Sequence, residues 1–442
     1  MSTLFASFNP TSKQEWVELL QKELKGESID VLQKFNRIEE IILPAYLHTE
    51  DASAPFSDPG IQPFTRGNNP ESNDWHIGTC FRLSSDEKTV NAEMLQALMS
   101  GTTALVMHAV SDKPIDFTVL LKDIGLEYIH TTFYAETTDQ AVAFLDVLGT
   151  ASGAVVVEND DVWLKCAASD SKNRRPFAVQ AMKVQRSGGT TWQEIAIALA
   201  EGHDLLVAQL EMGLTVDEAC ANIHFIFGIG NKYFYEIAKF RAFRTAWARI
   251  VETYDPTSHD AMKAFVTAET GFMHTALKDP YTNLLRQTTE AMSAVVGGVE
   301  QLVVQPYDWY STEPETVFTR RMATNISLLL KEEAYLHYVA DPAGGSYLLD
   351  ELTHTIAERA WELFREIEAK GGISTPETIS MLEQAITDKA EQRMQLIKDK
   401  KALLIGITTF PNPETVVADW NSFPEGWKSL PALIVESLYQ PA

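Results

Sequence analysis

Two features of this 442-residue sequence predict an α/β fold, a (β/α)8 TIM barrel. The first is the alternation of short apolar runs, typical of strands, with amphipathic helical segments along most of the chain. The second is the stretch 224–250, in which a complete strand–turn–helix unit can be read. Eight strands alternating with helices in one chain are the signature of this barrel. We expect a helical and extended arm before the barrel and further helices after it.

The stretch 224–250 begins with a run rich in Phe and Ile, turns at Gly228 and Gly230, and continues as a helix. Phe234 and Trp247 lie on the apolar face of that helix. The turn reads G-I-G-N-K-Y and lacks the third glycine of the dinucleotide fingerprint, so we reject that kind of nucleotide binding. Basic residues spaced along a helix usually form a solvated face. Here they are Lys239, Arg241, Arg244 and Arg249.

The remaining elements of the barrel follow from the same periodicities, with bounds uncertain by two to four residues. We predict strands at 103–109, 127–134, 153–159, 177–184, 223–228, 264–270, 301–305 and 334–340. We predict helices at 136–149, 192–211, 232–254, 280–297 and 316–332, followed by Ser346–Lys370 and Thr375–Lys400.

Residues 1–75 are predicted to form the arm. Ser12 is expected to cap a helix, with Glu15 completing a capping box. The apolar stripe of this helix needs a surface to pack on, in this chain or in another; it consists of Trp16, Leu19, Leu20 and Leu24. Residues 41–75 are rich in Pro and Gly and are predicted to be extended.

Residues 76–400 are assigned to the barrel and its trailing helices, and residues 401–442 to a tail or linker. The tail opens with a short apolar run, 402–407, that predicts a strand.

Composition excludes several classes of function. The net charge of −25 argues against a nucleic-acid partner, because phosphate binding needs concentrated Lys and Arg. No apolar run reaches about 18 residues, so no membrane span is expected. The first residues lack the features of a signal peptide. Cys80, Cys166 and Cys220 are far apart, which predicts buried thiols in a reducing cytoplasm and no metal site.

Several phrases of the sequence make the chain resemble methylmalonyl-CoA mutases over nearly its whole length. Besides 224–250, they are P-G-I-Q-P-F-T-R-G at 59–67, D-P-Y-T-N-L-L-R at 279–286, A-V-V-G-G at 294–298, F-T-R-R-M-A-T-N-I-S-L-L-L-K-E-E at 318–333 and D-P-A-G-G-S-Y at 341–347. The resemblance implies an acyl-CoA mutase barrel, in which the CoA tail threads the axis and a corrinoid domain caps the C-terminal mouth.

The chain departs from this family at the positions that carry its chemistry. The Tyr that touches the substrate in active members corresponds to Cys80. A second Tyr, and the His that donates to the substrate carbonyl, correspond to Met182 and Lys183. An Asn and a Glu near the corrinoid correspond to Gln305 and Trp309. Loss of one general acid–base group costs about 10²–10⁴-fold in rate. We therefore expect no catalytic, cofactor-binding or metal-binding residue in this chain.

The corrinoid-binding phrase of the family, Asp-x-His-x-x-Gly, is also missing. The nearest string, Asp74-Trp75-His76-Ile77-Gly78, is one residue short and is interpreted as coincidence. The resemblance therefore implies the small, non-catalytic subunit of a heterodimer. The large subunit would bind adenosylcobalamin and the acyl-CoA substrate.

Two alternatives stay open. The chain could be an autonomous barrel enzyme that uses Lys183, because burial can lower a lysine pKa toward neutrality. It could also be the barrel half of a split cobalamin-dependent mutase. Phe225 and Phe227 either face inward and fill the barrel axis, or face the helices as ordinary core. The basic residues expected to make charge-assisted pairs are Arg66, Arg286, Arg320 and Arg321.

Overall fold

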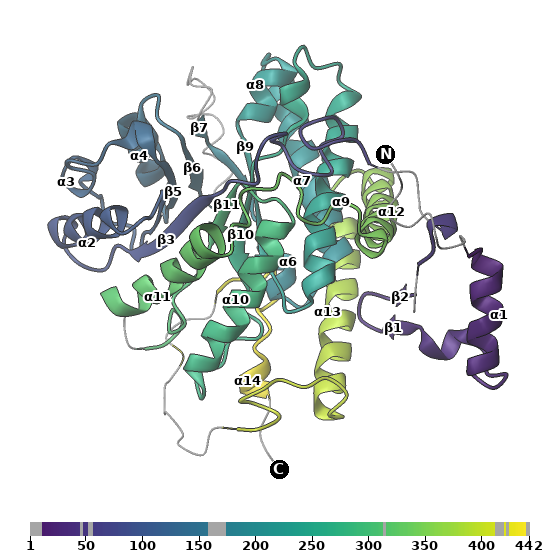
Figure 1. Cartoon of the computed structure of the whole chain (residues 1–442). Helices are drawn as coiled ribbons and strands as arrows, with labels where there is room; N and C mark the ends of the chain where they lie inside the picture. The colour runs from purple at the N-terminus through teal and green to yellow at the C-terminus, as the bar shows by residue number, and fades with distance from the viewer. Residues whose placement is uncertain are drawn as a thin grey trace, which may run out of the picture.

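The computed structural model describes residues 11–44, 47–51, 56–157, 174–312, 315–411, 420 and 424–438. Within these residues, nine strands form a parallel sheet that curls into a barrel surrounded by helices (Figure 1). The predicted α/β barrel is confirmed. Cys166 lies outside the described residues, whereas Cys80 and Cys220 are buried free thiols, as predicted.

The sheet closes through a single segment that changes partner at Pro176. β7 (Arg174–Arg175) pairs with β6 (Gly153–Val156), and β8 (Phe177–Val179) pairs with β9 (Ile223–Ile229). Proline donates no hydrogen bond, so the ladder is interrupted at that residue. The other barrel strands are β3 (His76–Arg82), β4 (Ala104–His108), β5 (His130–Tyr134), β10 (Val266–Thr270) and β11 (Gln301–Val303).

The helices agree closely with the periodicity of the sequence. Every helix predicted for the barrel and after it is present, with bounds shifted by a few residues. Those helices are α4 (Thr138–Leu148), α7 (Thr191–Glu211), α9 (Tyr233–Glu252), α10 (Pro280–Val296), α11 (Val317–Leu328), α12 (Tyr347–Ala369) and α13 (Pro376–Lys398). The additional helices are α2 (Glu87–Met99), α3 (Phe117–Leu120), α6 (Met182–Arg186), α8 (Val216–Ala221) and α14 (Val435–Leu438). Among the described helices, none is both long and apolar enough to cross a bilayer.

Three predicted strands are wrong in whole or in part. Residues 334–340 form turns after a π-helical segment (Leu329–Glu333), and Tyr335 has a φ of 53°. The strand predicted at 177–184 ends at Val179, because the chain turns into α6. Residues 402–407 form turns with one isolated bridge. The eighth barrel strand is instead β3, whose Gly, Thr and Cys residues gave no strand-like run.

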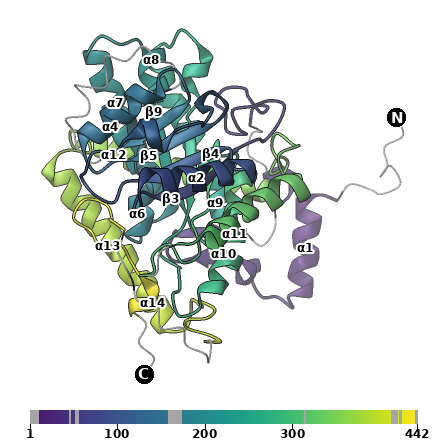
Figure 2. The same cartoon turned by 90° about the vertical axis from the view of Figure 1, so that its left-hand side faces the viewer.

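The described chain before the barrel begins with several short elements. It contains α1 (Lys13–Glu23), a 3-10 turn (Ile29–Leu32) and the hairpin of β1 (Lys34–Asn36) and β2 (Ile41–Leu43). Ser12 caps α1 and Glu15 completes the capping box, as predicted. No residue of α1 is buried, and Figures 1 and 2 show the helix projecting from the body. The described chain therefore leaves most of α1 open.

The predicted solvated face of α9 is wrong. Lys239, Arg241 and Arg244 are at most 1% exposed, whereas Phe234 of the predicted apolar face is 48% exposed. The reason is that α9 packs on α7 and α10 and is covered by α12, a neighbour that charge spacing along one helix does not reveal. Arg249 is exposed, as predicted, and its guanidinium lies 5.0 Å from the centre of the Trp361 ring.

Each buried cation of α9 has its own partners. The Lys239 Nζ lies 2.9 Å from the Glu194 carboxylate and 2.6 Å from that of Glu236, and it donates to the Gly228 carbonyl. Burial raises the pKa of Glu194 to about 7, although Lys239 opposes this shift. Lys239 therefore joins α7, α9 and the end of β9 around one charge.

Arg241 and Arg244 join α9 to segments that carry the family-like phrases. Arg241 donates to Asp341 at 2.8 Å and to Asp350 at 2.9 Å. Arg66, from the phrase at 59–67, donates to the other oxygen of Asp341 at 2.6 Å. Arg244 donates to the Gly297 carbonyl at 3.0 Å and to the Glu300 carboxylate at 3.2 Å. Three distant parts of the sequence are thus held together by ion pairs.

The other arginines that were predicted to form charge-assisted pairs make different kinds of contact. Arg286 donates to Asn283 at 2.9 Å, and Arg320 pairs with Glu93. Arg321 is exposed. These contacts lie within the chain.

The Arg241 cluster provides a test of this packing. The substitution Arg241→Gln leaves Asp350 without its cation and the buried Asp341 with Arg66 alone. We expect a loss of about 3–5 kcal/mol in the free energy of unfolding, because breaking a buried pair strands a charge. The exposed Arg249→Gln is the control and should cost less than about 1 kcal/mol. Equal urea-unfolding midpoints for the two variants would contradict this account.

Candidate functional site at the carboxyl end of the barrel

The carboxyl ends of the barrel strands border a cavity of about 770 Å³. Parallel barrels carry their sites at this end, because loops from many strands meet there. The side chains lining the cavity come from β3, β4, β5, α6 and the segment after β11. They include Arg82, His108, Tyr134, Met182, Lys183, Arg186, Gln305, Trp309 and Tyr310.

The structure brings the five positions singled out in the sequence to this end of the barrel. Met182, Lys183, Gln305 and Trp309 line the cavity. Cys80 lies beside it in an apolar cluster that includes Trp309. Residues more than 200 positions apart in the sequence are therefore neighbours, as the resemblance implied.

Cys80 and Met182 serve as core residues here. Both are 1% exposed. Cys80 packs with Val106 and Trp309, and Met182 packs with Ile226. Burial, with Glu269 nearby, raises the pKa of the Cys80 thiol well above its ordinary value. A protonated, buried thiol is a poor nucleophile.

Lys183 is paired. It lies in the first turn of α6, and its Nζ is 3.0 Å from the Glu425 carboxylate. Burial lowers the pKa of Lys183, and the contact with Glu425 opposes that shift. The ammonium therefore has a compensating negative charge from the C-terminal region.

Gln305 and Trp309 are held by contacts within the chain. The Gln305 side chain accepts a hydrogen bond from the Tyr310 hydroxyl at 2.8 Å. The Arg82 guanidinium stacks 4.2 Å from the centre of the Trp309 ring and donates to the Trp309 carbonyl. Gln305 is 4% exposed and Trp309 5% exposed, so both are part of the wall.

A polar network at the same end was missed by the sequence reasoning. Tyr134 donates to one oxygen of Glu269, and Arg186 donates to the other at 3.2 Å. Burial, with Glu269 adjacent, raises the pKa of Tyr134 well above its ordinary value. The His108 ring stacks on Tyr134 with centroids 4.2 Å apart. These residues come from different strands and share no local spacing, so no motif could reveal them.

The middle of the barrel axis is filled by polar side chains. Gln301 accepts from Thr267 at 3.2 Å and from Thr132 at 3.5 Å, and Thr267 also contacts His224 at 2.7 Å. All four residues are at most 2% exposed. Among the described residues, none lines both the cavity at this end and the one at the opposite end.

Phe225 and Phe227 face the helices, which decides the alternative left open by the sequence. Phe225 packs 4.8 Å from both Phe243 and Trp247, measured between ring centroids. Phe227 packs 4.7 Å from Phe243. They are ordinary core, and His224 and Ile226 are the residues of β9 that point to the axis.

Comparisons with known proteins identify the family. The family described as methylmalonyl-CoA mutase matches residues 160–425. The methylmalonyl-CoA mutase small subunit of Porphyromonas gingivalis is 30% identical, over 96% of this chain and 73% of that protein. The chain belongs to the methylmalonyl-CoA mutase family.

Other mutase-family relatives extend beyond the region matched here. The small subunit of Propionibacterium freudenreichii is 29% identical over 84% of this chain and 62% of that protein. A methylmalonyl-CoA mutase of Cereibacter sphaeroides is 28% identical over 89% of this chain and 64% of that protein. This chain therefore spans less than two thirds of the length of these two mutases.

Among solved structures, dihydropteroate synthase of Burkholderia cenocepacia is similar over 59% of this chain and 93% of that chain. The sequence identity is 10% and the TM-score 0.35, which carries no information about function.

The residues at the mouth do not fit the corrinoid that the mutase family implies. Gln305 and Trp309, which the resemblance aligns with residues that border the corrinoid, are buried and bound within the chain. His76, from the string that resembles the corrinoid phrase, lies on β3 with its ring stacked on His130 at 5.6 Å. That imidazole belongs to the amino end of the barrel, which supports the interpretation of the string as coincidence.

His108 makes stability at this end of the barrel depend on pH. Burial, with Arg82 and Arg186 nearby, lowers the pKa of His108 to about 3. The unfolded chain takes up this proton near pH 6.5. The contribution of neutral His108 to the free energy of unfolding is therefore fully present above pH 6.5. It is lost progressively as the pH falls from 6.5 toward 3.

The variant His108→Phe keeps the stacking on Tyr134 and removes the proton uptake. Below pH 6.5, the unfolding free energy of the variant should rise relative to that of the unsubstituted chain by about 1.4 kcal/mol per pH unit. Buried His130, His224 and His274 are common to both proteins and cancel in the difference. Urea unfolding between pH 4.5 and 8 measures it, and a difference independent of pH would refute this role of His108.

Proposed function

We propose that this chain is the non-catalytic small subunit of a methylmalonyl-CoA mutase, the enzyme that interconverts methylmalonyl-CoA and succinyl-CoA. It would form a heterodimer with a large subunit that binds adenosylcobalamin and the acyl-CoA. The observation that carries the proposal is that all five substituted family positions are engaged in packing or pairing. We assign residues 1–75 to subunit contact, 76–400 to the barrel and 401–442 to a tail or linker.

The chemistry of the mouth supports a non-catalytic role. A general acid or base works best with a pKa near the operating pH. The pKa of His108 is lowered to about 3, and those of Tyr134 and Cys80 are raised well above their ordinary values. Lys183 is paired with Glu425. The buried side chains of Gln301, Thr267 and Thr132 also occupy the middle of the axis, where a CoA tail would have to pass.

Exposed apolar residues of the arm support the proposed contact with a partner subunit. Phe35 and Ile42 lie opposite each other in the hairpin and are 58% and 56% exposed. Leu19 of α1 is 55% exposed. Exposed apolar side chains gathered on one element are typical of an interaction surface.

The hairpin is anchored on the body although its outer face is open. In the turn between β1 and β2, the buried Glu39 accepts hydrogen bonds from the Thr191 amide at 3.0 Å and the Thr191 hydroxyl at 2.8 Å. Glu40 pairs with Lys389 at 2.5 Å. The base of the arm therefore has a fixed position from which α1 projects.

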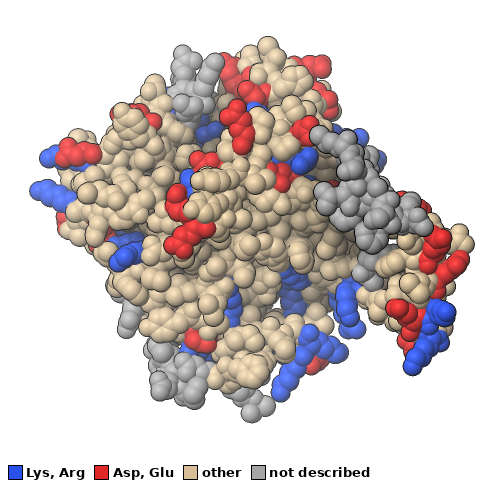
Figure 3. Space-filling model, in the orientation of Figure 1, with Lys and Arg blue, Asp and Glu red and all other residues tan. Residues whose placement is uncertain are grey.

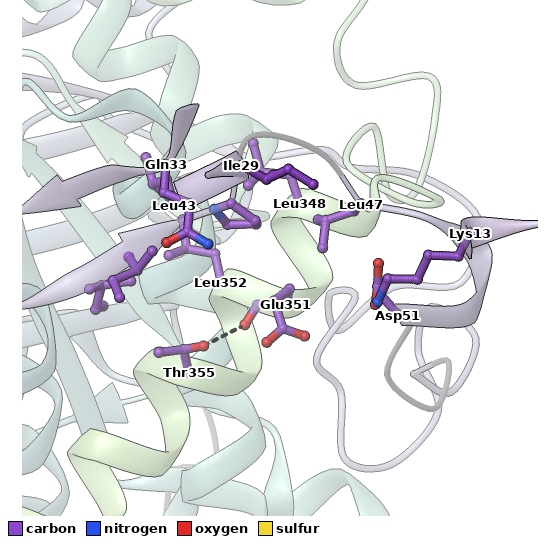
Figure 4. Close-up of a pocket in the computed structure, with 13 residues that line it drawn as sticks. Lys13, Ile29, Gln33, Leu43, Leu47, Asp51, Leu348, Glu351, Leu352 and Thr355 are labelled. Atoms are coloured by element: carbon purple, nitrogen blue, oxygen red, sulfur yellow. Dashed lines mark hydrogen bonds and ion pairs between the residues drawn. The ribbon is translucent and has the colours of Figure 1, made fainter. Parts of the chain in front are cut away.

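The arm does not pack tightly on α12. A cavity of about 390 Å³ separates them, and Figure 4 shows apolar side chains of both elements pointing into it. The side chains that line it include Ile29, Leu43, Leu47, Leu348 and Leu352, with the Lys13–Asp51 ion pair at one end. Loose packing at this junction supports an arm that is completed by another chain.

The reduced, buried Cys80 and Cys220 support a cytoplasmic location for this complex.

Co-purification tests the proposal directly. Tagged chain, isolated from its own host, should bring a larger mutase subunit at a one-to-one ratio, together with the visible spectrum of a corrinoid. The reconstituted pair should convert methylmalonyl-CoA, and this chain alone should not. A lone chain that binds corrinoid or turns over an acyl-CoA would refute the assignment.

The exposed hairpin face gives a sharper test of the contact. Phe35→Asp places a charge in the proposed interface and should weaken the complex by at least about tenfold. The unfolding free energy of the isolated chain should change by no more than about 0.5 kcal/mol, because Phe35 is exposed. Tyr128→Asp, also at an exposed aromatic residue, is the matched control. Equal dissociation constants for the two variants would exclude the hairpin from the interface.

Lys183→Ala separates this function from the autonomous-enzyme alternative. If Lys183 only pairs with Glu425, the activity of the heterodimer should stay within about twofold. Loss of a catalytic acid–base group would lower the rate by about 10²–10⁴-fold. A loss of that size, with the complex intact by gel filtration, would favour the alternative.

A further inference from the structure

A cavity of about 420 Å³ lies outside the mouth, between the hairpin of the arm, α13 and the segments that follow β9 and β10. A volume of this size is within the range of small-molecule sites. None of the five substituted family positions lines it. We call it the basic cavity because, within the described chain, the charged residues that line it are all cations. They are Arg37, Lys232, Arg393 and Lys401.

His274 brings a buried polar group to the wall of this cavity. The residue follows β10, lines the cavity and is only 8% exposed. Its Nδ1 atom has no hydrogen-bond partner among the described residues. Burial, with Arg393, Arg286 and Lys232 nearby, lowers the pKa of His274 to about 3, so the ring is neutral at pH 7. Buried nitrogen atoms normally have partners, so this imidazole is available to a molecule that enters the cavity.

Two of the cations converge on the same region as His274. Lys232 Nζ lies 3.5 Å, and Arg393 Nη2 lies 3.7 Å, from the same oxygen of Glu39. The other Glu39 oxygen accepts from Thr191, so a single carboxylate faces two cations. Burial lowers the pKa of Lys232 to about 8, although Glu39 opposes this shift. Burial also lowers the pKa of Arg393, so neither cation is fully compensated by Glu39.

The other charges near the cavity do not remove this excess of positive charge. Glu236 also attracts the two converging cations, but it is already paired with Lys239 at 2.6 Å. Lys401 pairs with Asp399 at 3.1 Å. Arg37 is exposed and makes no ion pair within the described chain. An anion that enters the cavity therefore meets more positive than negative charge.

Arg393 is held in place and still has an unused donor. Its Nε donates to the Gly188 carbonyl at 3.0 Å, and its Nη2 donates to the Gly189 carbonyl at 2.8 Å. These two bonds fix the plane of the guanidinium. In the described part of the chain, Nη1 makes no hydrogen bond. The group is therefore oriented before any ligand binds, which lowers the cost of binding.

The cavity also reaches the N-terminus of α9. Asn231 and Lys232 line it, and Lys232 is the N-cap residue, whose side chain makes no capping hydrogen bond. The first amide groups of a helix lack helical partners and carry the positive end of its dipole. The N-terminus of this 20-residue helix therefore favours an anion such as phosphate.

Apolar side chains form the rest of the lining. They come from the hairpin, the segment after β10, α13 and the C-terminal region. These residues are Phe35, Ile38, Met273, Leu396, Ile397, Ala402 and Val435. Figure 3 shows Lys and Arg side chains gathered around α13 beside the hairpin. A ligand for this cavity should therefore combine an anionic group with an apolar group.

We propose that the basic cavity binds a phosphomonoester. The phosphate lies among Lys232, Arg393 and His274 at the N-terminus of α9, and the organic group contacts the apolar wall. A phosphomonoester is close to a dianion at neutral pH, and its charge is compact, as the convergence of the cations requires. This site does not depend on the proposed subunit function, and it is tested on the full chain alone.

The test measures binding of butyl phosphate by isothermal titration calorimetry at pH 7.5 and constant ionic strength. The unsubstituted chain should bind it at least about threefold more tightly than inorganic phosphate, which lacks the apolar group. Lys232→Gln should weaken binding at least about tenfold, because it removes a charge-assisted pair. Lys34→Gln is the matched control, since Lys34 is an exposed hairpin residue outside the cavity and should leave binding unchanged.

Two further measurements make the outcome decisive. His274→Leu keeps all four cations and removes the imidazole donor, so it should weaken binding at least about threefold, even if Lys232→Gln fails to fold. Succinate carries two separated charges and should bind at least about threefold more weakly than butyl phosphate. Absence of butyl phosphate binding, equal affinity in the Lys232 and Lys34 variants, unchanged affinity in His274→Leu, or tighter binding of succinate would each overturn the proposal.

Discussion

The buried cations of α9 are the interactions on which the rest of the structure depends. Lys239, Arg241 and Arg244 are each removed from water, and each is held by carboxylates from other segments. Removal of a charge from water costs several kcal/mol unless its partners are in place. Any displacement of α12 or of the segment before β11 would separate such a pair. The ion pairs therefore specify where these elements sit, while the apolar core supplies most of the favourable energy.

These ion pairs explain why several of the family-like phrases contribute to the fold. Arg66 of the phrase at 59–67 and Asp341 of the phrase at 341–347 meet on Arg241 of the α9 unit. Sequence segments separated by more than 200 residues share one polar cluster. Their residue types are required by that cluster whether or not the barrel carries out chemistry. The presence of these phrases therefore does not by itself indicate that the barrel is catalytic.

The sequence predicted the long elements well and the neighbours of those elements poorly. Helices such as α7, α9 and α12 have many turns, so their periodicity is unambiguous. β3 was missed because Gly78, Thr79 and Cys80 form no apolar run, although the barrel buries all three. The solvated face of α9 was wrong because burial there is imposed by α12. Such features depend on tertiary contacts that local patterns do not contain.

The same distinction applies to the candidate site. The resemblance brought Cys80, Met182, Lys183, Gln305 and Trp309 together, because it supplied spatial information from a family. It did not reveal Arg82, His108, Tyr134 and Glu269, which lie on four separate strands. Once the strands are placed, inward alternation assigns these residues to the axis. The missing information was therefore the register of the barrel.

The two ends of the barrel differ in how well their polar groups are satisfied. At the mouth, Lys183, Arg186 and Glu269 each have a partner of opposite charge, and Cys80 and Trp309 pack as core. Catalytic sites commonly sacrifice stability by holding polar groups ready for a substrate. At this mouth the charged groups are already paired, which favours stability and supports the proposed non-catalytic role. At the amino end, by contrast, the buried atoms His130 Nε2 and His224 Nδ1 have no hydrogen-bond partner in the described chain.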